Sequence, residues 1–256
     1  MRRCVWAVVA AIVIVNSASS LSAQRGRDGG PAQPPLSPQA SAPLDLTGNW
    51  VSVVTEDWRW RMVTPPKGDF ASVPLNPEGQ KVGNAWDPST DGSCLAYGAA
   101  GLMRIPTRLR ITWENERTLK VETDAGVQTR RFLFGESQKP AERSPQGYSV
   151  AEWEVPAAGR GGPGAGRGGP PPARRGSLKV TTTMLSAGWL RKNGAPYSEN
   201  ASLTEYYDRF AAPNGEEWFA VTTIVSDPKY LNTDFVTSSH FKKEADGSKW
   251  APKPCK

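Results

Sequence analysis

The stretch SLTEYYDRFAAPNGEEWFAVTTIV, residues 202–225, decides the fold class. Two runs rich in β-branched and aromatic residues flank the turn-forming sequence PNGE, a pattern typical of two antiparallel strands joined by a short turn. Outward from this hairpin, strand-like runs recur in NWVSVV, WRWRMV, RLRITW, TLKVET, VQTRRFLF, SVAEWEV, SLKVTTT and DFVTSSHFKKE. In TLKVET, Leu119 and Val121 share one face while Lys120 and Glu122 share the other, as the period of two in a strand requires.

No stretch carries a sustained apolar period of 3.6 residues with helix caps, so helix is expected to be a minor component. About ten strands joined mostly by short turns predict an all-β protein built as a single antiparallel meander. Such a sheet removes its exposed edges by closing on itself. The expected fold is therefore one lipocalin-like β-barrel domain over residues 44–256.

The N-terminus predicts export. Arg2 and Arg3 precede the apolar run VWAVVAAIVIV, and small residues then lead to a cut after Ala23. Residues 1–23 are expected to be a signal peptide, because the run is too short for a stable membrane span. A retained N-terminal membrane anchor is the alternative. Residues 24–43 are rich in Gly, Pro, Ser and Gln and are predicted to be a disordered linker.

A second low-complexity segment, PAAGRGGPGAGRGGPPPARRG at residues 156–176, interrupts the domain. Strand-like sequences flank it, so it reads as a disordered insert that lengthens one hairpin turn, a change that loop entropy penalises slowly. Of the formal charge of +6, the signal peptide, linker and insert carry +2, +1 and +4, which leaves about −1 on the rest. The folding part has no basic footprint for phosphate, and no nucleic-acid partner is expected.

Cleavage would leave two cysteines, Cys94 and Cys255. In an oxidising compartment an even pair in one domain predicts a disulfide, here tying the C-terminal tail to the loop after the first hairpin. A metal site is the alternative. Two cysteines and the single His240 lack the close spacing of metal ligands, so neither a metal nor another cofactor is expected.

Two resemblances add to this interpretation. TGNW resembles the G-x-W start of lipocalin-type barrels, which implies that Gly48 relieves crowding at the barrel base and Trp50 plugs its closed end. LTGNW, QGYSVAEWE, LRKNGAPYSENASLTEYYDRF and VSDPKYLNTDFVTSSHFKK together resemble a family of exported, largely uncharacterised bacterial β proteins. That resemblance implies fold and compartment and supplies no reaction.

Candidate ligand-binding residues cluster near the start of the domain. In WRWRMV, Trp58 and Trp60 alternate with Arg59 and Arg61, so a regular strand turns either its aromatic or its cationic face inward. An inward aromatic face suits a flat apolar ligand; packing of a large core by the tryptophans is the alternative. The remaining expected lining and orienting residues are Arg108, Arg110, Trp113 and Tyr207.

Three residues are candidates for acid–base chemistry. A carboxylate beside tryptophans, such as Glu56 or Asp57, can have a raised pKa and act as an acid or base. His240 is the only histidine, and no G-x-S-x-G turn accompanies it. Ordinary turn or surface roles are the alternatives for all three residues.

The leading functional hypothesis is a periplasmic or secreted barrel that binds a small apolar or aromatic molecule in its interior. The alternative is a cofactor-independent enzyme of the same architecture, an isomerase, cyclase, hydratase or hydrolase, using Asp57, Glu56 or His240. A third reading is an envelope interaction protein whose insert makes the contact. No stable membrane span is expected after signal cleavage, and the sequence leaves the oligomeric state open.

Overall fold

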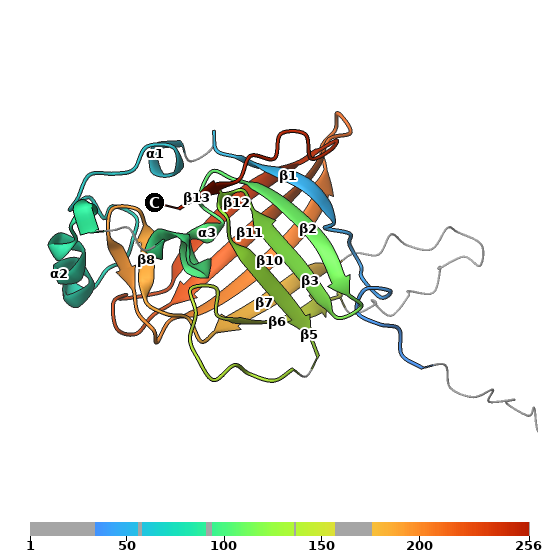
Figure 1. Ribbon diagram of the computed structural model, residues 1–256, viewed down its shortest axis with the longest axis horizontal. Helices are drawn as coiled ribbons and strands as arrows, with labels where there is room; N and C mark the ends of the chain where they lie inside the picture. Colours follow the sequence, from blue (N-terminus) through green and yellow to red (C-terminus); the bar gives the residue numbers. More distant parts are fainter. Residues whose placement is uncertain (1–33, 56–57, 91–93, 136, 157–175, 256) are drawn as a thin grey trace, which may run out of the picture. The chain divides into compact units, whose positions relative to one another are not determined.

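The computed structural model describes residues 34–55, 58–90, 94–135, 137–156 and 176–255 (Figure 1). The predicted signal peptide, most of the predicted linker and residues 157–175 of the predicted insert lie outside these ranges, as do Glu56 and Asp57. The chain separates into residues 1–35 and residues 36–256, and the second unit is described here by itself.

Nine strands close into a barrel, which confirms the all-β class and the closed sheet. Around the barrel the order is β1, β12, β11, β10, β7, β6, β5, β3 and β2, and β2 pairs with β1 to complete the circle. The bounds are β1 Gly48–Val53, β2 Arg108–Asn115, β3 Thr118–Thr123, β5 Thr129–Phe134, β6 Tyr148–Glu154, β7 Ser177–Thr183, β10 Ser202–Ala211, β11 Glu217–Ser226 and β12 Phe235–Glu244.

One pair of neighbours departs from the predicted antiparallel meander. β5 and β6 run parallel, with Phe132 beside Ser149, whereas every other neighbouring pair is antiparallel. An odd number of strands cannot close with alternating directions throughout, so nine strands require a parallel pair. The connection between β5 and β6 accordingly returns to the end at which β5 began (Figure 1). Lipocalin barrels have eight strands, so the ninth strand and the parallel pair differ from the predicted lipocalin pattern.

The barrel interior is packed by side chains that alternate inward along each strand. Trp50 is fully buried and donates through Nε1 to the Leu46 carbonyl oxygen at 2.9 Å. Its ring lies 4.8 Å from that of Phe219, which in turn stacks on Phe241 at 4.8 Å. Tyr207 continues the cluster 6.0 Å from Phe219. Aromatic side chains therefore fill this level of the barrel.

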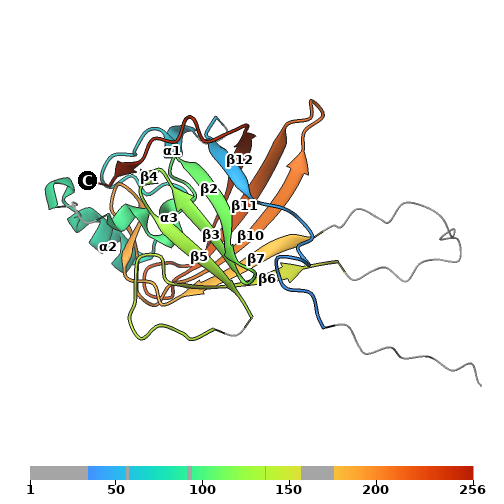
Figure 2. The ribbon, with the colours of Figure 1, turned by 45° about the vertical axis from the view of Figure 1, so that its right-hand side comes forward.

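A cap covers one end of the barrel (Figures 1 and 2). A hydrophobic cluster separate from the barrel core holds the cap in place. It joins the cap residues Leu190, Ala195 and Tyr197 to the barrel residues Leu203 and Val225. The elements outside the barrel are α1 Trp58–Arg61, α2 Pro77–Ala85, η1 Pro88–Thr90, η2 Leu95–Tyr97, α3 Ala99–Leu102, β4 Ala125–Gly126, β8 Gly188–Arg191, β9 Ala195–Tyr197 and β13 Lys253–Pro254. α2 begins where Asn76 accepts a hydrogen bond from the Gly79 amide, with Pro77 at the first helical position.

The prediction of a strand at WRWRMV is wrong. Residues 58–61 form the short helix α1, and the chain beyond it runs into the cap. Trp58 and Met62 are 60% and 58% exposed, so neither faces the barrel interior. The helix α1 brings Arg61 back to the end of β1. There the Nη1 of Arg61 donates to the Val53 carbonyl oxygen at 2.7 Å.

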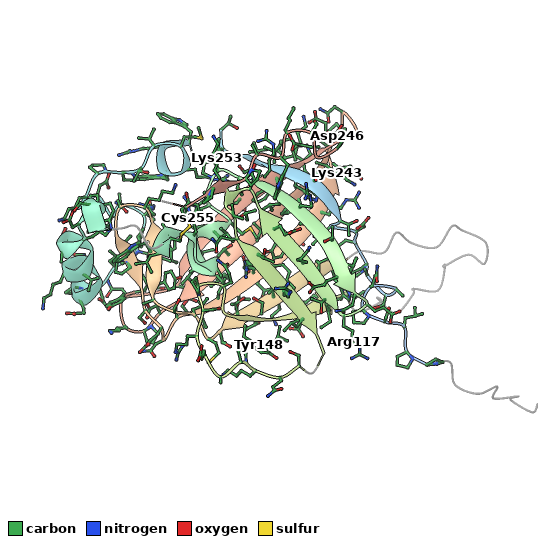
Figure 3. The ribbon with its side chains drawn as sticks, viewed as in Figure 1. Arg117, Tyr148, Lys243, Asp246, Lys253 and Cys255 are labelled. Atoms are coloured by element: carbon green, nitrogen blue, oxygen red, sulfur yellow. A yellow bond between two sulfur atoms is a disulfide. The ribbon has the colours of Figure 1, made fainter. Side chains whose placement is uncertain are left out.

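The predicted disulfide between Cys94 and Cys255 is present. β13 pairs in parallel with β4, and the Lys253 amide donates to the Asp124 carbonyl oxygen at 2.8 Å. Figure 3 shows Cys255 beside the cap and Arg117, in the turn between β2 and β3, at the opposite end of the barrel. The C-terminal tail is thus fastened next to the cap.

Residues that precede position 44 already contact the barrel. Trp153 donates through Nε1 to the Pro38 carbonyl oxygen at 2.8 Å, and Leu44 packs against the barrel core. Among the described residues, no helix has the length and apolar character needed to cross a bilayer.

Candidate functional site

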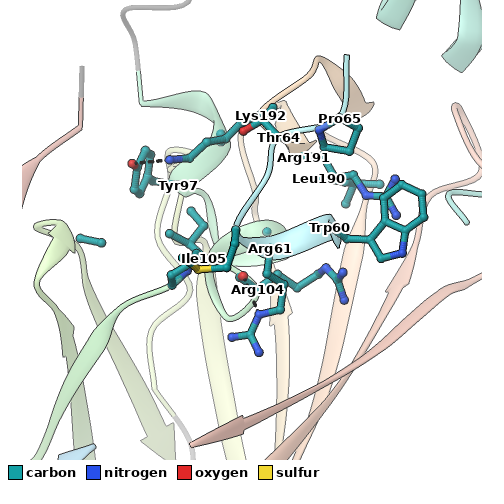
Figure 4. Close-up of a pocket in the computed structure, with 15 residues that line it drawn as sticks. Trp60, Arg61, Thr64, Pro65, Tyr97, Arg104, Ile105, Leu190, Arg191 and Lys192 are labelled. Atoms are coloured by element: carbon teal, nitrogen blue, oxygen red, sulfur yellow. Dashed lines mark hydrogen bonds between the residues drawn. The ribbon is translucent and has the colours of Figure 1, made fainter. Parts of the chain in front are cut away.

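Two concavities flank α1 at the capped end. The first, here called the cap cleft, lies between α1, α3 and β8 and has a volume of about 260 Å³ (Figure 4). The second, here called the edge cleft, lies between α1 and the beginning of β12 and has a volume of about 340 Å³. Trp60, Arg61, Arg104 and Arg191 line both.

The cap cleft combines aromatic and cationic side chains. Lys192 donates to the Tyr97 hydroxyl at 2.9 Å, and its ammonium lies 4.8 Å from the centre of that ring (Figure 4). The guanidinium of Arg191 lies 4.6 Å from the Trp60 ring, which also carries the exposed Arg59 at 4.5 Å. Such cation–π contacts hold both partners in place. The site therefore offers flat apolar surface next to positive charge.

Hydrogen bonds to backbone carbonyls fix two of these arginines. Arg61 donates to the carbonyl oxygens of Val53 and Arg104, at 2.7 and 3.0 Å. Arg191 donates through Nη1 to the Ala71 carbonyl oxygen at 2.7 Å. Both side chains are almost fully buried, at 8% and 6% exposure. Because an arginine carries five N–H donors, a bond to a carbonyl oxygen is compatible with binding a ligand oxygen as well.

A glycine on β4 shapes the wall beside Tyr97. Gly126 has φ of +76°, and a Cβ at this position would overlap the Tyr97 ring. On the other side, Gly101 of α3 lies so close to β8 that a Cβ would sit 3.0 Å from the Trp189 carbonyl oxygen. Both glycines let backbone segments approach closely, and the approach positions Tyr97 at the cleft.

The structure does not gather the predicted ligand-binding residues into one site. Trp60 and His240 share the edge cleft, whereas Trp58 is exposed outside the barrel. Arg59 stacks on Trp60. Arg108, Arg110 and Trp113 lie on β2, and Tyr207 lies on β10.

Arg108 and Arg110 share the outer face of β2. Arg108 pairs with Glu244 at 3.1 Å, and the guanidinium of Arg110 lies 4.5 Å from the Trp250 ring. Arg108 therefore bonds the last residue of β12, and Arg110 packs against the C-terminal segment that follows it.

Trp113 and Tyr207 point inward but take part in core packing. Trp113 is half-buried beside Phe134 at 5.5 Å and Trp153 at 6.4 Å. Tyr207 is fully buried, and its hydroxyl donates to Glu205 Oε1 at 3.2 Å. Burial, followed by the Glu205 carboxylate, raises the pKa of Tyr207 well above its ordinary value.

A buried ion pair lies inside the barrel and was missed from the sequence. Arg130 donates through Nη1 and Nη2 to the two carboxylate oxygens of Glu205, at 2.9 and 2.6 Å, with both side chains at 0% exposure. Its Nη2 also donates to the Thr182 hydroxyl at 3.2 Å. Burial lowers the pKa of Arg130, but the Glu205 and Tyr207 interactions outweigh it and raise the pKa overall.

The alternating pattern contained a signal for this pair. On β5, Arg130 shares the buried face with Phe132 and Phe134. On β10, Glu205 lies between Leu203 and Tyr207 on the buried face. A charge on an apolar face at strand spacing indicates an internal partner of opposite sign. No comparable signal existed for the cap cleft, because Tyr97, Arg104 and Lys192 come from separate loops and elements.

No three His, Cys, Asp or Glu side chains within the described ranges are placed to hold a metal ion together. No protein-family model, no curated protein and no solved structure matches this chain.

Proposed function

We propose that this protein binds a small aromatic molecule with a negatively charged or strongly polar end, and that it does so in the cap cleft. The ring would stack beside Trp60 and Tyr97, and Arg191 and Lys192 would orient the polar end. The observation that carries the proposal is the contrast between two places. Aromatic side chains fill the barrel around Trp50, whereas the capped end keeps a concave volume of about 260 Å³.

The chemistry of the lining supports this ligand class. Ligand sites are typically concave and apolar with a few converging polar groups. Here Ile105 and Leu190 supply apolar surface, and Arg191 and Lys192 supply positive charge next to it. The proposed site differs from the expected one. The ligand binds at the capped end instead of inside the barrel, and the barrel serves as a rigid scaffold for the site.

We further propose that the protein acts in the periplasm or outside the cell. The disulfide between Cys94 and Cys255 supports this compartment, because such bonds persist under oxidising conditions. The test is the mass of the mature chain purified from an exporting bacterial host. Cleavage after Ala23 supports the proposal, and an intact N-terminus with reduced cysteines contradicts it.

The binding test uses 1-anilinonaphthalene-8-sulfonate, an aromatic probe with an anionic group. Its fluorescence should rise and saturate with the native protein. Trp60→Leu should weaken the probe's affinity by about tenfold or more, because a stacking surface is lost. The matched control is Trp113→Leu at the barrel's other end, which should leave the affinity unchanged. Loss of binding in the Trp113 variant alone would place the ligand inside the barrel instead.

An enzyme of the same architecture is the second candidate. The observation that favours it is the position of His240, which lines the edge cleft together with Trp60. Incubation with an extract of small aromatic compounds should then change the mass of a component. His240→Ala or Asp57→Asn should abolish that change. Saturable binding without any change in mass would reject the enzyme and support binding as the function.

A further inference from the structure

The disulfide lies next to one wall of the cap cleft. Cys94 immediately precedes η2, the short helix that carries Tyr97, and the Tyr97 amide donates to the Cys94 carbonyl oxygen at 2.8 Å. Cys255 immediately follows β13, which pairs in parallel with β4. Gly126 of β4 lies against the Tyr97 ring so closely that a Cβ there would overlap it. The bond between the two cysteines therefore joins the two segments that meet at Tyr97.

Two amide side chains connect the disulfide to Tyr97. Gln128 Nε2 lies 3.9 Å from Cys255 Sγ, a weak acceptor, and donates to the Gly126 carbonyl oxygen at 2.7 Å. Gln146 Nε2 donates to Gln128 Oε1 at 2.9 Å and to the Tyr97 carbonyl oxygen at 2.8 Å. Polar contacts therefore lead from the Cys255 sulfur to the backbone of Tyr97.

The backbone is strained at two positions within these contacts. Cys94 and Val127 have φ of +61° and +51°, in the left-handed region that residues other than glycine rarely adopt. Val127 lies between Gly126 and Gln128 and is β-branched, which makes this conformation more costly. Such conformations persist only where the surrounding structure enforces them. Because the disulfide is one of the enforcing contacts, we expect both residues to relax when it is broken.

The disulfide is placed for reaction with thiols. Cys94 and Cys255 are both half-buried, so part of each residue faces solvent. A dithiol reduces such a bond in two steps. One thiolate of the dithiol attacks a cysteine sulfur and expels the other cysteine as a thiolate, and the second thiolate of the dithiol then displaces the first cysteine. Two electrons and two protons pass to the cysteines, and the dithiol becomes a disulfide.

We propose that this disulfide controls ligand binding in the cap cleft. In the oxidised protein Tyr97 is held where its ring meets Lys192 and the ligand. After reduction by a dithiol the C-terminal segment is no longer tied to η2, Tyr97 loses its fixed position, and the affinity for the ligand falls. The inference rests on the proposed binding function of the cap cleft and adds a redox condition to it.

The release of Tyr97 is measured first without a ligand, by NMR spectroscopy of the oxidised and the dithiothreitol-reduced protein. The Lys192 ammonium lies 4.8 Å from the centre of the Tyr97 ring, so the ring displaces the Lys192 side-chain signals. Reduction should move these signals toward the values of a free lysine. Signals of Phe219 and Phe241 in the barrel core should stay unchanged and show that the reduced protein is folded. Unchanged Lys192 signals would overturn the proposal whether or not the cleft binds a ligand.

The affinity for 1-anilinonaphthalene-8-sulfonate is then compared in the two states. Reduction should weaken binding by about fivefold or more, a coupling typical of linked sites. The double variant Cys94→Ser with Cys255→Ser should show the same loss without any reductant. Equal affinity in the oxidised and the reduced folded protein would reject redox control and leave the proposed binding site intact. No saturable binding by the oxidised protein would reject the binding function, and this inference with it.

Two variants separate the route through Tyr97 from a general loss of stability. Gln146→Leu removes the bonds to Tyr97 and Gln128 while the disulfide stays intact. It should weaken probe binding in the oxidised protein and add little in the reduced protein, because both changes release the same contact. The matched control is Trp250→Leu, which removes the contact of the C-terminal segment with Arg110 and should leave the affinity unchanged. If the reduced protein does not fold, Gln146→Leu decides, and undiminished binding by this variant in the oxidised state would reject the coupling.

Discussion

Glu205→Gln should destabilise the barrel strongly, because it leaves the Arg130 guanidinium charged and without its carboxylate. Both side chains are at 0% exposure and are joined by two hydrogen bonds of 2.9 and 2.6 Å. Removing one member of such a pair typically costs about 3–5 kcal/mol, since a buried charge remains uncompensated. For a domain of this size that loss lowers the midpoint of thermal unfolding by roughly 6–20 °C.

The assay is chemical unfolding followed by tryptophan fluorescence, with native, single-variant and double-variant proteins in parallel. Arg130→Met combined with Glu205→Leu removes both charges and keeps apolar volume, so it should recover most of the loss in Glu205→Gln. The stability of the double variant also shows whether the barrel needs the ion pair or folds equally well with apolar side chains in its place. A cost below about 1 kcal/mol for Glu205→Gln would refute the reasoning, because a cost that small is typical of an exposed pair.

Three further predictions concern the cap and its surroundings. Reducing the disulfide, whose cysteines are 161 residues apart, should lower the free energy of unfolding by about 2–5 kcal/mol, measured by urea unfolding with and without reductant. Gly126→Ala should displace Tyr97 and weaken probe binding in the cap cleft, whereas Gly215→Ala, with φ of +83° and open space around it, should cost stability alone. Burial raises the pKa of Tyr197 to about 12, so the unfolded chain loses this proton first and stability should fall between about pH 10 and 12. Tyr197→Phe should make that alkaline decline shallower in unfolding curves, and an unchanged decline would argue against a buried neutral phenol.

Strand alternation predicted much of the barrel because each strand has one buried and one exposed face. Leu119 and Val121 face inward while Lys120 and Glu122 face outward, as the pattern required. The two cysteines of the predicted domain likewise predicted their own bond, because two thiols allow one pairing. These features depend on residues that are close in sequence or unique in the chain.

The helix α1 and the cap cleft could not be predicted in the same way. WRWRMV fits a period of two, yet Arg61 reaches the end of β1 and the Arg104 carbonyl from a helical turn. The choice between strand and helix was therefore made by tertiary contacts. Tyr97 and Lys192 meet across the cleft from positions 95 residues apart, and nothing local marks either residue as a neighbour of the other.

Chemical-shift mapping with 1-anilinonaphthalene-8-sulfonate locates the ligand site most directly. Titration of the ¹⁵N-labelled protein should shift amide signals of residues 96–106 and 190–192, which line the cap cleft, and leave residues 219–223 inside the barrel wall unchanged. Shifts concentrated at residues 219–223 and around Trp50, with none at the cap, would contradict a binding site at the capped end.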